Sequence, residues 1–121
     1  MERVLGFGGF FFRAEDPKAL AAWYETHLGI DPVPGDYETP CWRQAEGETV
    51  FAPFEKVTDY FGNAEKQFML NFRVRDLAAM IEQLEATGIE VRRDPEAPYP
   101  NGDFAWLNDP EGNPIELWEP A

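Results

Sequence analysis

Reactive side chains are scarce in this sequence. Cys41 is the single cysteine and His27 the single histidine among 121 residues, so an internal disulfide is impossible. A catalytic thiol needs a base beside it, and His27 falls near the end of an expected helix, so we interpret Cys41 as a half-buried packing residue. No apolar run is long enough to span a bilayer, and none resembles a signal peptide. The expected location is therefore the cytoplasm.

Positive charge is also scarce. The sequence has ten Lys and Arg residues and 23 Asp and Glu residues, which gives a formal net charge of -13. Such a charge repels nucleic acids and anionic membrane surfaces and attracts cationic guests. The simpler interpretation is an acidic, well-solvated surface that aids solubility. We expect neither a nucleic-acid nor a membrane partner.

The second half of the chain repeats the first. Phe12-Arg13-Ala14-Glu15-Asp16 reappears about 60 residues later as Phe72-Arg73-Val74-Arg75-Asp76. Each copy is followed by a helical pattern and a Gly-Ile pair. With 44% hydrophobic residues, the chain is long enough for one domain but too short for two. The repeat therefore predicts a single domain built from module 1–56 and module 67–121, joined by linker 57–66.

Each half has the pattern of one strand, one helix and further strands. In the first half we expect a strand at 4–13, a helix that Asp16 caps and Gly29 ends, and short strands within 31–54. In the second half we expect a strand at 67–74, a helix between Asp76 and Gly88, and strands near 90–92, 103–107 and 115–119. Residues 109–113 have the composition of a turn between the last two strands. Each half is thus predicted to be βαβββ.

The segment Asn108-Asp109-Pro110-Glu111-Gly112-Asn113-Pro114-Ile115-Glu116-Leu117, in a doubled βαβββ chain, resembles the glyoxalase/bleomycin-resistance/extradiol-dioxygenase superfamily, the vicinal oxygen chelate fold. Trp23-Tyr24 and Leu28-Gly29 add to the resemblance, which covers nearly the whole chain. It implies an α+β fold with two tandem βαβββ modules forming a curved mixed-sheet half-barrel pair. It also implies a homodimer, because relatives commonly pair so that modules from two chains complete each barrel.

The resemblance implies where a metal would bind. Metal-dependent relatives hold one divalent ion on inward-facing residues, commonly His, Gln or Glu, in the first and last strands of each half. Those positions fall on Gly9, Phe51, Met69 and Glu116, of which only Glu116 matches. One carboxylate is too few for a catalytic metal site, so we expect no metal and no cofactor.

Strand alternation predicts which side chains share the cleft with Glu116. The candidate ligand-binding residues are Phe11, Arg13, Phe51, Met69, Asn71, Arg73, Trp106 and Trp118. Glu116 is the candidate catalytic acid or base. The simpler interpretation is that the aromatic rings are core and that Arg13 or Arg73 neutralises Glu116.

Three functions remain open on this basis. The first is a small-molecule-binding protein that uses no metal, similar in kind to the drug-sequestering members of the superfamily. The second is a glyoxalase-type lyase, isomerase or dioxygenase, either metal-dependent or using Glu116 as acid and base. The third is a dimeric interaction module without catalysis.

Overall fold

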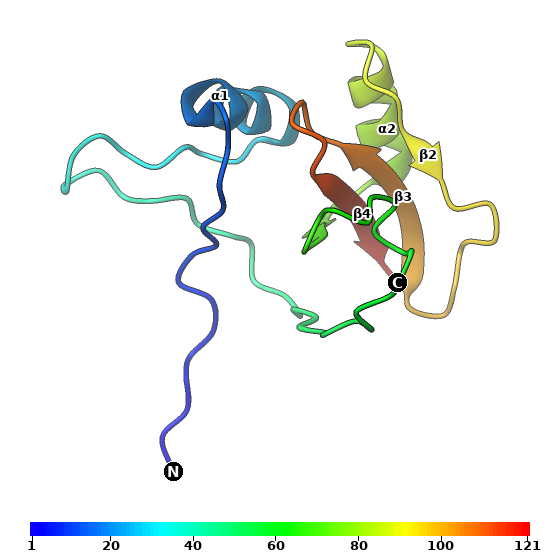
Figure 1. Cartoon of the computed structure of the whole chain (residues 1–121), viewed down its shortest axis with the longest axis horizontal. Coiled ribbons are helices and arrows are strands. Elements are labelled where there is room, and N and C mark those ends of the chain that lie inside the picture. Colours follow the sequence, from blue (N-terminus) through cyan, green and yellow to red (C-terminus); the bar gives the residue numbers. More distant parts are fainter.

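The computed structural model describes all residues, 1–121, and contains two helices and one sheet (Figure 1). In chain order the elements are α1 (Pro17–Leu28), β1 (Leu70–Arg73), α2 (Leu77–Glu85), β2 (Arg92–Arg93), β3 (Gly102–Asn108) and β4 (Pro114–Pro120). The four strands form a mixed sheet in the order β1-β4-β3-β2, in which only the β1–β4 pair is parallel. The fold is α+β, and the second half has the predicted βαβββ order.

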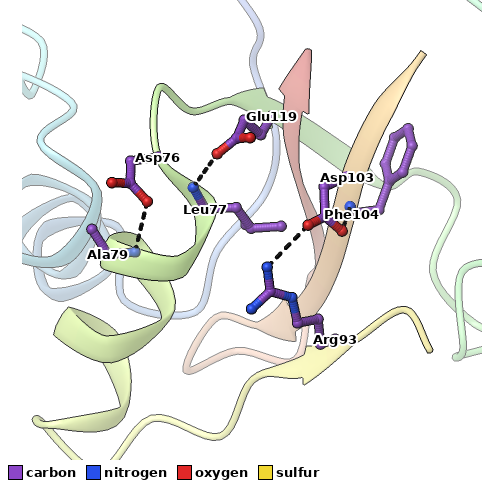
Figure 2. A network of polar contacts seen from close by, with 7 residues as sticks. All are labelled: Asp76, Leu77, Ala79, Arg93, Asp103, Phe104 and Glu119. Atoms are coloured by element: carbon purple, nitrogen blue, oxygen red, sulfur yellow. Dashed lines mark hydrogen bonds and ion pairs between the residues drawn. The ribbon is translucent and has the colours of Figure 1, made fainter. Parts of the chain in front are cut away.

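Local side-chain contacts explain where the two helices begin. Asp16 accepts a hydrogen bond from the Ala19 amide at 3.1 Å, and Asp76 accepts one from Ala79 at 3.0 Å. At α2, Glu119 of β4 also accepts from the Leu77 amide at 2.7 Å, which attaches the helix to the sheet (Figure 2). All three contacts satisfy amides that have no partner within the helix.

Glycines follow both helices. Gly29, with φ of 71°, ends α1 directly and donates its amide back to the last turn. α2 ends at Glu85, three residues before the expected Gly88, which has φ of 86° in the turn that follows. A left-handed residue suits glycine because it has no Cβ to clash with the backbone.

The core lies on one face of the sheet. α1 contributes Leu20 and Tyr24, and α2 contributes Leu77 and Leu84. The sheet contributes alternate residues of β3 and β4: Ala105, Leu107, Ile115 and Leu117. Because successive strand residues point to opposite faces, the side chains between these residues lie on the other face, which is the candidate site.

The turn at residues 109–113 attaches α1 to the second half. Buried Asp109 accepts hydrogen bonds from the Tyr24 hydroxyl at 2.7 Å and the Asn113 side-chain amide at 2.7 Å. The Glu111 carboxylate accepts from the amides of Glu15 and Asp16, immediately before α1. The segment that carries the family resemblance therefore connects the two halves.

The strands expected in the first half do not form. No residue of 4–13 or 31–54 belongs to a strand, and the N-terminal segment runs away from the sheet (Figure 1). Its rings meet other rings, as Phe7 does Phe51 and Phe10 does Phe68, but its backbone forms no hydrogen bond with another segment. A strand needs a partner for its backbone groups, and the prolines at positions 32, 34 and 40 have no amide hydrogen to donate. Cys41 lies in this region and is exposed, so its expected half-buried packing role was wrong.

Candidate ligand-binding site

The face of the sheet opposite the core combines polar and aromatic side chains. We call it the polar face; its residues are Asn71, Arg73, Phe104, Trp106, Glu116 and Trp118. Register places Asn71 and Trp106 on either side of Glu116, and Arg73 and Phe104 on either side of Trp118. The rings of Phe104 and Trp118 are stacked with centroids 6.3 Å apart. The predicted alternation, with Glu116 and Trp118 opposite the core residues Ile115 and Leu117, is confirmed.

Glu116 is the centre of a hydrogen-bond cluster on this face. Its side chain is buried, with 6% of the residue's surface exposed. Oε2 accepts from the Tyr60 hydroxyl at 2.5 Å and from Trp106 Nε1 at 2.8 Å, while Oε1 accepts from Asn71 Nδ2 at 2.8 Å. All three donors are neutral. Glu116 forms no ion pair, because the sole salt bridge of the structure joins Arg93 and Asp103.

Arginine does not neutralise Glu116, contrary to one interpretation of the sequence. Arg73 instead donates to the Ala45 carbonyl oxygen at 2.8 Å. Its guanidinium lies so close to Gly47 that a Cβ there would be 1.8 Å from Nη1. Arg13 is exposed and donates no side-chain hydrogen bond within the chain. Arg73 therefore holds the 45–47 segment against the sheet.

Tyr60 is the member of the cluster that the sequence did not identify. It comes from the linker, where the residues show no helical or strand period, so no pattern placed it beside the sheet. Burial and the hydrogen bond to Glu116 raise the pKa of Tyr60 above its ordinary value. The phenol therefore remains protonated and able to donate at neutral pH.

A hollow of about 270 Å³ opens between residues 42–50 and strands β1 and β4. We call it the sheet hollow. Most of its lining is apolar, and it includes Trp42, Val50, Asn71, Arg73, Met80 and Trp118. A second hollow, of about 320 Å³, lies beside Trp23 and Pro110 and contains none of the candidate residues. Apolar walls with a few polar groups are typical of small-molecule sites.

The structure brings some candidate residues together and leaves others apart. Asn71, Arg73 and Trp118 line the sheet hollow, and Trp106 binds Glu116. Phe11 and Phe51 are largely exposed, at 94% and 76%. Neither these two nor Arg13 and Met69 line the sheet hollow. The part of these four residues in binding stays a prediction.

Residues 9–118 match the family model of the glyoxalase-like domain. The chain belongs to the glyoxalase-like domain family. No functionally curated protein matches it in sequence. Solved structures of low sequence identity superpose on it and have the same fold.

Three structures illustrate that likeness to the glyoxalase-like fold. A protein from Bacillus anthracis assigned to the glyoxalase family is 23% identical, with a TM-score of 0.55 over 86% of this chain and 84% of that one. TnmS3, an antibiotic binding protein from Streptomyces sp. CB03234, is 19% identical, with a TM-score of 0.56 over 88% of each chain. A glyoxalase/bleomycin resistance protein/dioxygenase superfamily member from Sphaerobacter thermophilus is 20% identical, with a TM-score of 0.56 over 88% and 90%.

At the positions where the resemblance implies metal ligands, the residue types suit a divalent ion poorly. Gly9 and Phe51 offer no ligand atom, and a Met69 thioether suits soft ions. No three His, Cys, Asp or Glu side chains lie close enough together to hold an ion. Glu116, the one matching residue, already accepts three hydrogen bonds.

Neither helix has the length and apolar character needed to cross a membrane.

Proposed function

We propose that this glyoxalase-like domain binds a small organic molecule in the sheet hollow and uses no metal to do so. The hollow itself carries the proposal. Its walls are mainly apolar, and Asn71 and Arg73 supply an amide and a guanidinium that can orient a guest. Its volume of about 270 Å³ suits a compact guest or one end of a larger one.

The antibiotic-binding function named for TnmS3 supports the same class of activity, since that protein has the same fold. The fold alone does not specify a guest. The proposal therefore extends to small-molecule binding and not to a particular antibiotic. An acid–base role for Glu116 remains the second candidate, favoured by the burial of its carboxylate on the polar face.

A pair of matched variants tests the location. Val50 lines the sheet hollow and is 71% exposed, whereas Val57 is 90% exposed and lies outside it. Fragment screening by ¹H–¹⁵N NMR would first identify compounds that shift the indole signals of Trp42 and Trp118. V50W is expected to weaken such binding at least tenfold, and V57W to leave it unchanged. Equal affinity for both variants would place the guest elsewhere.

We also propose that the protein forms a homodimer through its first half. Large apolar side chains near the N-terminus, among them Val4, Leu5 and Phe11, are more than 90% exposed. The backbone around them belongs to no helix or strand and forms no backbone hydrogen bond, and β1 lies at the open edge of the sheet. A second copy would cover these side chains and supply backbone partners. Native mass spectrometry should give twice the 13.8 kDa chain mass.

A further inference from the structure

Glu116 is a buried carboxylate whose negative charge no basic side chain balances. Three neutral donors hold it: Tyr60 and Trp106 donate to Oε2, and Asn71 donates to Oε1. Burying a carboxylate is unfavourable unless hydrogen bonds or a cation compensate. The three donors offset part of this cost, and no basic side chain of the protein adds to them.

The basic side chains around the polar face are bound elsewhere. Arg73 donates to the Ala45 carbonyl oxygen, and Lys66 donates to the Glu111 carbonyl oxygen. Arg92 is exposed and lies over the Trp106 ring, 6.0 Å from its centroid. The cation that would complete Glu116 is therefore absent from the chain's own residues.

Aromatic rings flank the carboxylate. Tyr60 meets Trp106 edge to face with centroids 6.1 Å apart, and Phe54 stacks on Tyr60 at 5.6 Å. Ring faces attract organic cations, whereas a hard metal ion needs several oxygen ligands. One carboxylate among aromatic rings thus suits an organic ammonium group.

Tyr60 controls access to this carboxylate. Its hydroxyl occupies Oε2, yet the residue is 44% exposed and belongs to neither a helix nor a strand. Turns held by single backbone hydrogen bonds surround it: Thr58 donates to Glu55 at 2.9 Å and Gly62 to Asp59 at 3.0 Å. Movement of this side chain would expose Oε2 without disturbing the sheet.

We infer that Glu116 binds a protonated amine of the guest, which takes the place of the Tyr60 hydroxyl on Oε2. This inference rests on the proposed function, because Asn71 both donates to Glu116 and lines the sheet hollow. An ammonium on Glu116 would thus adjoin the rest of the guest in the hollow. The exchange replaces a neutral hydrogen bond by a stronger charge-assisted one.

Benzylamine, benzyl alcohol and benzoate provide the test, since they differ mainly in the charge of one group. We would titrate each into ¹⁵N-labelled wild-type protein at constant ionic strength and follow the Trp106 indole signal, because that N–H donates to Glu116. Benzylamine is expected to shift the signal saturably and to bind at least tenfold more tightly than the other two. Equal affinity for the amine and the alcohol would overturn the inference.

Variants separate a binding role from a structural one. Glu116→Gln should weaken benzylamine binding at least tenfold, while Glu96→Gln, which removes one exposed charge elsewhere, should not. Tyr60→Phe should strengthen it severalfold, because no hydroxyl then competes for Oε2. This variant also keeps two donors on Glu116, so it remains informative if Glu116→Gln fails to fold.

Weaker amine binding by Tyr60→Phe would mean that the phenol belongs to the site and is not displaced, which contradicts the inference. The proposed function fails separately, by the V50W comparison. If V50W weakens binding of a guest and Glu116→Gln does not, the proposal of small-molecule binding stands. Only the amine-binding role of Glu116 is then removed.

Discussion

Tyrosine hydroxyls hold both of the buried carboxylates that this chain leaves without a cation. Tyr60 donates to Glu116, and Tyr24 donates to Asp109, which is 4% exposed. Asp109 also accepts from the amides of Glu111 and Asn113. Neutral donors stabilise a buried carboxylate where no basic side chain reaches it. The two tyrosines nevertheless differ, because Tyr24 is buried in the core and Tyr60 is partly exposed.

Removing the Tyr24 hydroxyl should destabilise the fold. Tyr24→Phe would leave Asp109 without one of its donors, and an incompletely satisfied buried carboxylate costs about 1–3 kcal/mol. Urea denaturation should show this loss in the free energy of unfolding. Tyr37→Phe is the matched control, since Tyr37 is fully exposed and should change stability by less than about 0.5 kcal/mol. Equal stability of the two variants would mean that the contact with Asp109 is energetically unimportant.

Tyr24 should also make the stability of the fold depend on pH in the alkaline range. Burial first, and then the hydrogen bond to Asp109, raise the pKa of Tyr24 above its ordinary value. The unfolded chain loses this proton near pH 10, as a free tyrosine does, while the folded chain retains it. Its stabilising contribution is therefore complete below about pH 10 and falls above it, by up to about 1.4 kcal/mol per pH unit.

Urea midpoints measured between pH 8 and pH 11 should reveal that slope. Wild-type protein and Tyr37→Phe should lose stability in parallel, and Tyr24→Phe should lose it less steeply because it lacks the titrating hydroxyl. Identical slopes in wild-type protein and Tyr24→Phe would contradict the raised pKa.

The helices were predicted correctly because the residues that begin and end them are close to them in the sequence. Both helices begin at the predicted aspartate caps, and α1 ends at Gly29, because capping depends on neighbouring residues. The long strands of the second half, β3 and β4, were found because alternate residues of each face the core. The strands of the first half were wrong because strand formation depends on a distant partner, which an apolar run such as 4–13 cannot specify.

In the candidate site, too, the residues on strands were predicted correctly and the contacts from irregular segments were missed. Asn71, Trp106 and Glu116 lie together as alternation along β1, β3 and β4 requires. Tyr60 could not be placed, because it reaches the sheet from a segment without a periodic pattern. The Arg73 contact with Ala45 was missed for a similar reason, since it joins residues far apart in the chain.

The start of β3 depends on a glycine. Gly102 is buried with φ of 137°, and a Cβ there would lie 2.2 Å from the Glu119 carbonyl oxygen and 2.7 Å from Trp118 Nε1. Gly102→Ala should therefore lower the free energy of unfolding by roughly 2–4 kcal/mol, through a clash with fixed backbone and strain.

Gly62→Ala is the matched control for Gly102→Ala. Gly62 also has a positive φ, of 78°, but a Cβ there would meet nothing within 4 Å. It should cost only the conformational strain of about 1–2 kcal/mol. Equal losses in thermal unfolding for both variants would mean that backbone conformation, and not the contact with β4, decides the effect.

For the whole molecule, charge and exposed apolar surface act in opposite directions. The net charge is -13, most acidic residues are exposed to water, and a single salt bridge pairs one of them. Like charge opposes association of two copies. The exposed apolar side chains near the N-terminus favour it, because covering them removes apolar area from water. Ionic strength should therefore decide how strongly the proposed homodimer forms.

Raising the salt concentration should strengthen the dimer. Screening shortens the range of repulsion from about 10 Å at 0.1 M to about 3 Å at 1 M salt, while the apolar contact remains. Sedimentation velocity between 50 mM and 1 M NaCl should show the dimer fraction rising with salt. Phe11→Asp should weaken the dimer at every salt concentration, because it places a charge among the N-terminal apolar side chains.

Val33→Asp is the matched control for Phe11→Asp. It adds the same charge at another exposed position, 85% accessible, and should affect the dimer only through net charge. A monomer at all salt concentrations, or equal effects of the two variants, would show that the N-terminal segment is not the interface.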